Sequence, residues 1–469
     1  MQKKTKIIAT IGPVSSDYDS LKKLAKAGVN IFRLNFSHGT HEWHEEVIKR
    51  IRRLNQKSKE NYAILLDTKG PEIRTGDLKF PVELKKGDEV ILSVDPAAEF
   101  EGDSRIGVNY DAFIQDVDEG EKILIDNGVM NFRVKTKTKT DVICEVLDGG
   151  KLTSRRHLNL PGKDVSLESI TEKDWKDIKF GVKWGVDFIA LSFVRRADEI
   201  YELKAFLKEN NSKIDVIAKV ESFEATKHLG TICEASDGIM VARGDLGAEI
   251  PFSHVPRVQR EIVEICKNFQ KPVIVATHML ESMIVNPIPT RAEVSDVSTA
   301  VFQRADAIML SGETAGGKFP IKSAETMTEI ALETEKEFLE TRPIRKIEIT
   351  SEREDFSFIA AKMAEDLPVV SAILVITRSG FMANLVSSFR PKVPIFAFTN
   401  ESKTRRKMQL LWGVYPLGIE FSSQPQKTVL RAKEQFLKHY PEWTGKKFIL
   451  ISDFLVEGEF IPTLQIRKF

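Results

Sequence analysis

Chemically reactive side chains follow two apolar runs in the middle of the chain. The runs 215–220 and 238–241 have the apolar composition of short buried strands. Two carboxylates at neighbouring strand ends can hold a hard divalent cation, and a lysine beside them can stabilise negative charge. A buried ion pair that closes a barrel is the structural alternative. The residues concerned are Lys219 and Glu221 on the first run, and Arg243, Gly244 and Asp245 after the second.

Further polar groups stand at the ends of other apolar runs. Arg33 and Arg74 are forked cations that suit phosphate oxygens. Four oxygen donors with one formal charge among them suit a monovalent cation better than Mg²⁺, whereas Glu221 and Asp245 suit a divalent one. Gly244 presents a backbone N–H that suits a carboxylate. Together these residues predict metal-assisted chemistry on a phosphorylated anion. The four oxygen donors are Asn35, Ser37, Asp67 and Thr68.

Eight apolar strands alternate with amphipathic helices over the first three quarters of the chain. This alternation predicts parallel pairing and a closed (β/α)8 barrel, the TIM barrel, with catalytic groups at the carboxyl ends of the strands. An open doubly wound sheet is the alternative, but no GxGxxG follows the first strand. The predicted strands are Lys6–Thr10, Val29–Leu34, Tyr62–Leu66, Asp187–Ser192, Asp215–Val220, Gly238–Val241, Pro272–Ala276 and Ala307–Leu310.

The pattern changes twice along the chain. After Gly70-Pro71, short strands and turns replace helices, which predicts an inserted β-barrel-like domain. After the polar stretch 340–353, a smaller α/β pattern follows. We therefore expect a barrel at 1–69 and 170–342, an inserted β domain at 70–169 and a C-terminal α/β domain at 343–469.

Composition excludes several classes of function. The 469 residues are 42% hydrophobic and 29% charged with a net charge of +1, so neither nucleic acid nor a membrane is an expected partner. The three cysteines show no metal-binding spacing, and no apolar run approaches the ~20 residues that span a bilayer. The N-terminus lacks the features of a signal peptide, so the expected location is the cytoplasm.

Nine motifs, in order along the chain, carry a resemblance to pyruvate kinases, and most of all to the bacterial members of that family. They are TKIIATIGP, FRLNFSHGTHEWH, LLDTKGPEIRTG, HLNLPGKDVSL, GVDFIALSF, SDGIMVARGDLGAEIP, ATHMLESM, PTRAEVSDV and IMLSGETAGGKFP.

The resemblance implies a reaction, phosphoryl transfer from phosphoenolpyruvate to ADP to give pyruvate and ATP in glycolysis. It implies that Lys219 and Arg33 contact the phosphoryl group, that Gly244 and Asp245 lie at the substrate, and that Thr277 lies where the enolate is protonated. It also implies Mg²⁺ or Mn²⁺ on Glu221 and Asp245, and K⁺ on Asn35, Ser37, Asp67 and Thr68. The nucleotide would contact Asn35, His38, Arg74 and Arg156.

The resemblance extends to regulation and assembly. The inserted domain would act as a lid, and the protein would be an allosteric homotetramer.

Arg156 stands where the family has a lysine, and His278 where glutamine is usual. The effector loop keeps its start at Thr377 but carries Phe381 and Met382 in place of an arginine and a hydroxyl. Fructose 1,6-bisphosphate is therefore not the expected effector. AMP or another sugar phosphate remains a candidate effector, and a loop that binds no effector is the alternative.

Two other classes of function compete with the kinase. A barrel lyase of the aldolase type would use the same metal for enolate chemistry, although the lid and the two arginines argue against it. A metabolite sensor would bind without turnover, although the complete catalytic set argues against that.

Overall fold

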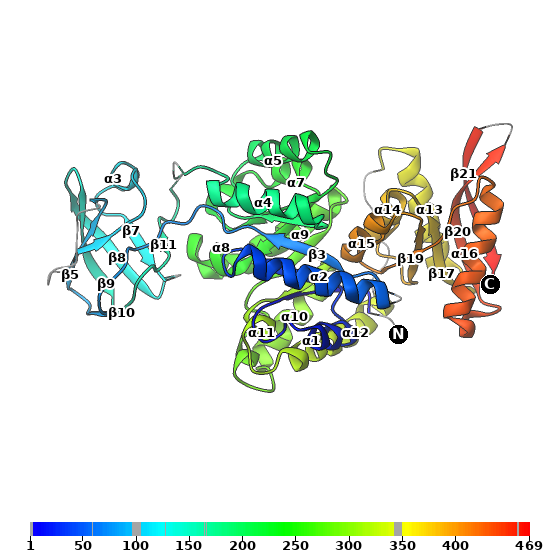
Figure 1. Cartoon of the computed structure of the whole chain (residues 1–469), viewed down its shortest axis with the longest axis horizontal. Coiled ribbons are helices and arrows are strands. Elements are labelled where there is room, and N and C mark those ends of the chain that lie inside the picture. Colours follow the sequence, from blue (N-terminus) through cyan, green and yellow to red (C-terminus); the bar gives the residue numbers. More distant parts are fainter. Residues whose placement is uncertain are drawn as a thin grey trace.

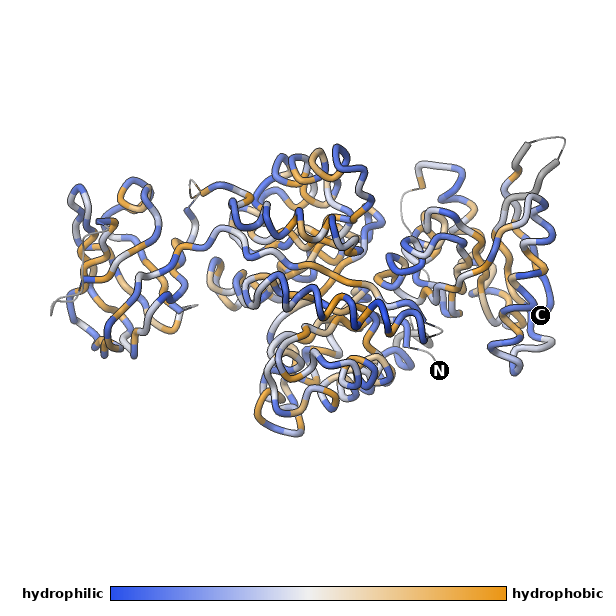
Figure 2. Tube along the Cα trace, viewed as in Figure 1, coloured by the Kyte–Doolittle hydropathy of each residue, from blue (hydrophilic) through white to orange (hydrophobic). Residues whose placement is uncertain are grey.

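Three bodies lie in a row in the computed structural model: a lid, a central barrel and a C-terminal domain (Figure 1). Figure 2 shows apolar residues concentrated within each body, with hydrophilic residues along the outer helices. Each body has its own core of buried side chains. The structure describes residues 3–58, 60–95, 105–126, 128–163, 165, 167–341, 349–456 and 459–469, and the side chains of these except 338–341, 453–456 and 459–460.

The central body is a closed barrel of eight parallel strands in the order β1-β16-β15-β14-β13-β12-β3-β2, so the predicted (β/α)8 fold is confirmed. Side chains alternate along each strand, so that Ile8 packs inside the barrel while Ile7 and Ala9 pack against the helices. The strands are β1 Lys6–Thr10, β2 Ile31–Asn35, β3 Ala63–Asp67, β12 Phe188–Leu191, β13 Asp215–Val220, β14 Gly238–Ala242, β15 Val273–Ala276 and β16 Ala307–Leu310.

Helices cover the outside of the barrel, and local signals set their ends. In α4, for example, Thr171 and Asp174 form a capping box, and Gly185 ends the helix in the left-handed conformation. The helices are α1 Tyr18–Lys26, α2 His41–Lys57, α4 Glu172–Trp184, α5 Ala197–Glu209, α6 Phe223–Lys227, α7 Leu229–Ala235, α8 Arg243–Glu249, α9 Val255–Asn268, α10 Arg291–Phe302, α11 Gly312–Ala315 and α12 Pro320–Thr341, with short 3-10 turns at Phe252–His254 and Glu281–Ile284.

The lid is a six-stranded curled sheet, ordered β11-β7-β8-β9-β5-β6, with a small β10-β4 pair beside it. Its core includes Phe113, Phe132 and Ile123, all fully buried. The elements are β4 Val82–Leu84, β5 Glu89–Ser93, β6 Arg105–Gly107, α3 Phe113–Asp116, β7 Lys122–Ile125, β8 Met130–Lys137, β9 Asp141–Asp148, β10 Gly150–Leu152 and β11 Leu158–Asn159.

The C-terminal domain is a five-stranded sheet, ordered β19-β18-β17-β20-β21, with an apolar core on each face. Only β21 runs antiparallel, against β20. The elements are α13 Glu352–Asp366, β17 Val370–Ile376, α14 Phe381–Ser388, β18 Ile395–Thr399, α15 Ser402–Lys407, a 3-10 turn Met408–Leu410, β19 Val414–Gly418, α16 Pro425–His439, a 3-10 turn Pro441–Trp443, β20 Lys447–Val456 and β21 Glu459–Lys468.

Two features differ from the sequence-based expectation. The strands β19 and β21 were not predicted, because each is stabilised mainly by pairing with a partner strand rather than by its own pattern. The expected domain boundary at 342/343 lies outside the described residues.

Candidate active site

A cavity of about 500 Å³ lies at the carboxyl ends of the barrel strands, beneath the segments that lead into the lid. It brings together side chains from β2, β13, α8 and the segment that follows β3, which are far apart in the sequence. The lining residues are Arg33, Asn35, Ser37, His38, Thr68, Lys69, Glu72, Arg74, Arg155, Phe193, Lys219, Glu221 and Asp245.

Lys219 is the most heavily engaged cation of this cavity. Its Nζ lies 3.0 Å from Asp67 Oδ1 and 3.0 Å from Glu221 Oε1, and it donates to Ser192 Oγ at 2.7 Å. Burial lowers the pKa of Lys219, but Asp67 and Glu221 outweigh it and hold the pKa above its ordinary value. The ammonium therefore stays charged, and three oxygens lie within 3.0 Å of its Nζ.

Arg33 is fixed beside Lys219 by the same carboxylate. Its Nε lies 2.5 Å from Asp67 Oδ2, and its Nη1 donates to Thr10 Oγ1 at 2.8 Å. Asp67 is fully buried, which raises its pKa, but Arg33 and Lys219 outweigh burial and hold that pKa below its ordinary value. One ionised carboxylate thus orients two cations toward the cavity.

Glu221 carries negative charge that its surroundings do not fully balance. Burial raises the pKa of Glu221 to about 7; Lys219 opposes this shift, and Asp245 and Asp67 add to it. Its Oε2 accepts from the Phe193 N–H at 2.7 Å, which leaves Oε1 shared with Lys219. Glu221 thus shares Lys219 with Asp67, and Asp245 lies in the same cavity.

The donor set fits a divalent cation that completes its shell with other oxygens. Glu221 and Asp245 both line the cavity, and an added cation would offset their mutual repulsion. Within the described part of the chain, no group of three or more His, Cys, Asp or Glu side chains is arranged to hold a metal. A metal on these two carboxylates therefore needs further oxygens from substrate or water.

The predicted monovalent-cation ligands cluster at the ends of β2 and β3, where Asn35 and Asp67 are register partners. Asn35 Oδ1 accepts from the Ser37 N–H at 3.1 Å, and the Thr68 carbonyl accepts from Ser192 Oγ at 2.7 Å. Each of these oxygens has a second lone pair. Asn35, Ser37 and Thr68 line the cavity, whereas Asp67 is enclosed behind Arg33 and Lys219.

Gly244 and Thr277 meet across the ends of β14 and β15. The Gly244 N–H donates to Thr277 Oγ1 at 2.8 Å, and this hydroxyl donates to the Ala276 carbonyl at 2.7 Å. The N–H that was expected to bind a carboxylate is thus already bonded. Thr277 has φ +65°, which is strained for a β-branched residue, and the next residue, His278, has φ +51°. Arg243 holds this backbone by donating to the Thr277 carbonyl at 2.6 Å.

The predicted nucleotide ligands lie at the lid side of the cavity. Arg74 Nε donates to Glu72 Oε2 at 2.8 Å, and its Nη1 donates to the Arg155 carbonyl at 2.7 Å. His38 is exposed. Arg156 lies in the lid, where its Nη1 is 3.3 Å from Asp126 Oδ1, and it lines an adjoining cavity of about 240 Å³ together with Arg74 and Asp245.

A buried carboxyl group and a buried hydroxyl lie one strand away, in the residues that follow β16. Glu313 Oε2 accepts from the Ser311 N–H at 2.7 Å, and its Oε1 accepts from the Leu280 N–H at 3.0 Å. Burial raises the pKa of Glu313, and the Ser311 hydroxyl is buried without a hydrogen-bond partner in the structure.

Four residues were not selected from the sequence although the structure places them here. Lys69, Arg155 and Phe193 line the cavity, and Ser192 Oγ accepts from Lys219 while it donates to the Thr68 carbonyl. Lys69 stands between two selected residues, so its position was a usable signal. Arg155 and Phe193 both have positive φ, a backbone conformation that no pattern in the sequence predicts at these positions.

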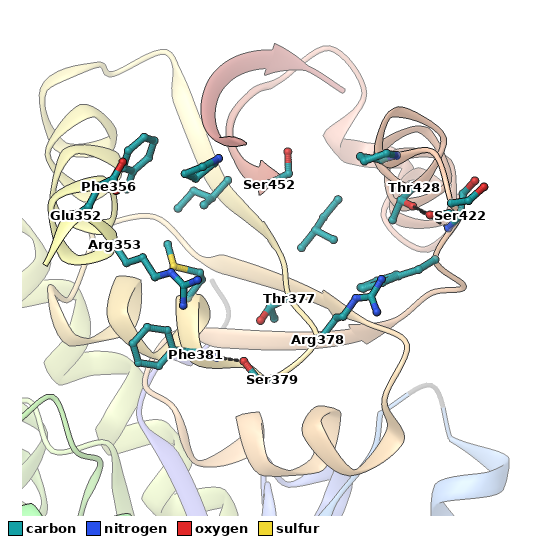
Figure 3. Close-up of a pocket in the computed structure, with 17 residues that line it drawn as sticks. Glu352, Arg353, Phe356, Thr377, Arg378, Ser379, Phe381, Ser422, Thr428 and Ser452 are labelled. Carbon is teal, nitrogen blue, oxygen red and sulfur yellow. Dashed lines mark hydrogen bonds between the residues drawn. The ribbon is translucent and has the colours of Figure 1, made fainter. Parts of the chain in front are cut away.

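A second cavity, of about 570 Å³, lies in the C-terminal domain around the loop 377–382 (Figure 3). Arg378 lies over the ring of Phe421 at 5.6 Å, and Arg353 lies over that of Phe381 at 6.0 Å. Ser452 Oγ is buried without a hydrogen-bond partner in the structure. The cavity therefore combines aromatic walls with two cations.

The family models and the individual relatives that match this chain all point to the same family. The model of the pyruvate kinase barrel domain matches residues 2–324, and that of the pyruvate kinase alpha/beta domain matches 354–458. Plastidial pyruvate kinase 2 of Arabidopsis thaliana is 47% identical over 475 residues, covering 100% of this chain and 81% of that protein. Pyruvate kinase of Geobacillus stearothermophilus is 45% identical over 424 residues, covering 88% and 71%.

The relatives correct the predicted location. Plastidial or chloroplastic pyruvate kinases of Arabidopsis thaliana and Nicotiana tabacum are among the matches that span nearly the whole chain, which contradicts the cytoplasmic expectation. That expectation rested on the lack of an apolar signal segment, and such a lack does not distinguish one aqueous compartment from another. Among the described residues, the helices are all too short or too polar to cross a membrane.

Proposed function

The chain belongs to the pyruvate kinase family, and we propose that it transfers the phosphoryl group of phosphoenolpyruvate to ADP. The P–O bond to the enol oxygen breaks, a P–O bond to the β-phosphate of ADP forms, and the enolate takes up a proton to become pyruvate. The observation that carries this proposal is one cavity that combines Lys219 and Arg33 with two carboxylates and a further arginine, Arg74.

Lys219 and Arg33 bind the transferring phosphoryl group. Phosphoryl transfer depends on positioning and charge neutralisation more than on covalent chemistry. Asp67 holds both cations within 3.0 Å of its carboxylate, so they need little reorganisation when substrate arrives. Because three oxygens already surround Lys219 Nζ, a phosphoryl oxygen competes with these contacts.

Glu221 and Asp245 hold Mg²⁺ or Mn²⁺, and Asn35, Ser37, Asp67 and Thr68 hold K⁺ in our proposal. The cations supply positive charge for the phosphoryl oxygens. The support for the divalent site is that Glu221 and Asp245, from β13 and α8, both line this cavity. Glu72 binds Arg74 and so orients the guanidinium that would contact ADP.

Thr277 and Gly244 form the wall at which the enolate is protonated. The strained backbone at Thr277 directs its hydroxyl toward Gly244 rather than outward. Glu313 and Ser311 follow β16, which pairs with the strand β15 that precedes Thr277, and they are suited to order a proton-relaying water. The lid carries Arg156 and would exclude water from the reacting phosphate.

A coupled assay with lactate dehydrogenase tests the reaction. With phosphoenolpyruvate, ADP, Mg²⁺ and K⁺, we expect NADH oxidation that depends on all four additions. Replacing K⁺ with Na⁺ and omitting Mg²⁺ test the two cation sites separately. Aldol cleavage without ADP would favour the lyase alternative, and binding without turnover would favour the sensor.

The C-terminal cavity is the proposed effector site. Phe381 and Met382 stand where the family has an arginine and a hydroxyl, whereas Arg353 and Arg378 remain available to an anion at aromatic walls (Figure 3). We expect AMP or a sugar monophosphate to lower the KM for phosphoenolpyruvate and fructose 1,6-bisphosphate to leave it unchanged. Sharper saturation with the bisphosphate would contradict this proposal.

The proposed assembly is a homotetramer. Sedimentation velocity at micromolar concentration measures it directly, and we expect a species of four times 53.0 kDa. A monomer throughout the concentration range would contradict the proposal.

A further inference from the structure

A hydrogen bond joins the lid directly to the barrel helix that carries Asp245. Asn159, on the strand β11 that leads back from the lid, donates from Nδ2 to Glu249 Oε1 at 2.7 Å. Asn159 is only 3% exposed. Figure 1 shows β11 on the lid side of the junction and α8 at the end of the barrel that faces it.

Glu249 is linked to the two segments that carry Asp245 and Glu221, the carboxylates of the candidate metal site. It ends α8, whose first turn contains Gly244 and Asp245, so the same two-turn helix carries all three residues. Burial raises the pKa of the Glu249 carboxyl, and the Asn159 amide and the Phe223 N–H, two residues after Glu221, oppose that shift. One side chain therefore links the lid to the segments that position Glu221 and Asp245.

The side-chain amide of Asn159 makes only some of the hydrogen bonds that are open to it. The Asn159 Oδ1 atom is buried without a hydrogen-bond partner in the structure, and a buried acceptor without a partner is costly. A cavity of about 60 Å³ lies beside the contact, lined by Asn159, Glu249, His157 and Phe193 among others. The return segment thus has room to shift, and a different lid position could give Oδ1 a donor.

We propose that Glu249 is a positioning residue that couples the position of the lid to the orientation of α8. The inference rests on the proposed function, because Asp245 is a metal ligand only in that function. Movement of β11 pulls on the Glu249 carboxylate, and α8 transmits the shift to Asp245 because the helix is short and hydrogen-bonded internally. Glu249 does not contact substrate in this arrangement.

A double-mutant cycle separates coupling from simple anchoring. The variants are Asn159→Ala, Glu249→Ala and the double variant, with Asn131→Ala as a matched control. Asn131 makes the same amide–carboxylate contact, at 2.8 Å to Asp148 Oδ2, but entirely within the lid. Glu249→Gln is the conservative rescue variant, because its amide can donate to the Asn159 Oδ1 atom.

Two readouts are needed, one of them without metal or substrate. In the metal-free and nucleotide-free protein, we expect faster amide hydrogen exchange in α8 for Asn159→Ala and Glu249→Ala. In the assay, we expect each single variant to raise the KM for phosphoenolpyruvate and the half-saturating Mg²⁺ concentration about 3- to 10-fold, with kcat changed less. The double variant should resemble either single one, and Glu249→Gln should recover part of the effect.

Three results would overturn the proposal. They are fully additive effects on KM, unchanged exchange in α8 for both single variants, and a control variant that behaves like Asn159→Ala. If the wild-type protein shows no kinase turnover, the proposed function fails, but the hydrogen-exchange cycle still decides whether the lid and α8 are coupled.

Discussion

Lys219 illustrates how single residues set the chemistry of the site. Its charge is maintained in a buried position because Asp67 and Glu221 lie 3.0 Å from Nζ. Removing a buried charge from such a cluster leaves its partners uncompensated, so the effect extends beyond one contact.

The first prediction concerns this ammonium. Lys219→Met should lose about 10²-fold or more in kcat, because one preorganised charge at the phosphoryl group is removed. The coupled assay measures the loss, and circular dichroism checks that the fold is retained. Lys49→Met, at an exposed lysine of α2, is the control. A near wild-type rate in Lys219→Met would refute the assigned role.

His44 gives a second prediction at the residue scale, on pH. Its ring stacks on Phe36 at 3.9 Å, its Nε2 bonds the His38 carbonyl at 2.9 Å, and its Nδ1 is buried without a partner in the structure. Burial lowers the pKa of His44 to about 4, although Asp177 opposes the shift, while His41 and Lys173 add to it. Protonation would place a second N–H where no acceptor lies.

The sign follows from linkage between protonation and folding. Between pH 6.5 and 4 the unfolded chain binds a proton at His44 that the folded chain does not, so the free energy of unfolding falls as pH falls. Above pH 6.5, His44 causes no loss of unfolding free energy. At low pH, the loss that this residue causes amounts to about 3 kcal/mol at most. Urea unfolding of wild type and His44→Phe across this range should show a shallower pH slope in the variant. Equal slopes would contradict the prediction.

At the scale of elements, one helix N-terminus anchors the segment that leads into the lid. Asp174 completes the capping box of α4 with Thr171, and its Oδ1 accepts from the N–H groups of Lys69 and Gly70 at 3.0 and 3.1 Å. Gly70 has φ +74°, and a Cβ there would lie 2.8 Å from Ser192 Cβ, so only glycine fits this turn.

The third prediction follows from this double role. Asp174→Ala should lower the free energy of unfolding by about 3 kcal/mol, because a cap is lost and two N–H groups lose their acceptor. It should also raise the KM for phosphoenolpyruvate, since Lys69 lines the active-site cavity. Glu293→Ala, in the capping box of α10, is the control and should lower stability alone. An equal KM change in both variants would contradict the assignment.

At the scale of the whole molecule, charged pairs join the barrel to the C-terminal domain. Asp187, Asp215 and Asp306 lie at the amino ends of barrel strands, opposite the active site. Arg406 Nε lies 2.7 Å from Asp187 Oδ1, Lys407 pairs with Asp215, and Arg390 Nη2 lies 2.7 Å from Asp306 Oδ2. The candidate active site and the contacts with the C-terminal domain thus occupy opposite ends of one barrel.

The fourth prediction tests this interface. The side chains of Arg390 and Asp306 are 4% and 3% exposed, so Arg390→Ala leaves a buried carboxylate without its cation. We expect a loss of about 3 kcal/mol or more and a lower thermal midpoint, measured by calorimetry, with kcat nearly unchanged. Lys49→Ala, at an exposed ion pair, should leave the midpoint unchanged. A large fall in kcat at full saturation would show that the interface does more than hold the domains.

Local pattern was sufficient for the strands of the barrel and for most of the candidate site residues. Lys6–Thr10, Asp215–Val220 and Ala307–Leu310 occur with the bounds expected from their apolar runs, because a buried parallel strand needs a continuous apolar segment. Lys219 and Glu221 could be selected because polar groups at the end of such a run need a specific reason to be there.

Tertiary structure decided which of these groups touch. That Asp67 holds both Arg33 and Lys219, that Gly244 bonds Thr277, and that Asn159 reaches Glu249 depend on strand register and on the path of the lid. Such contacts join residues 33 to 152 positions apart, and sequence periodicity carries no information on pairing at that range. The strands β19 and β21 were missed for the same reason, since their partners in the sheet, rather than their own residues, define them.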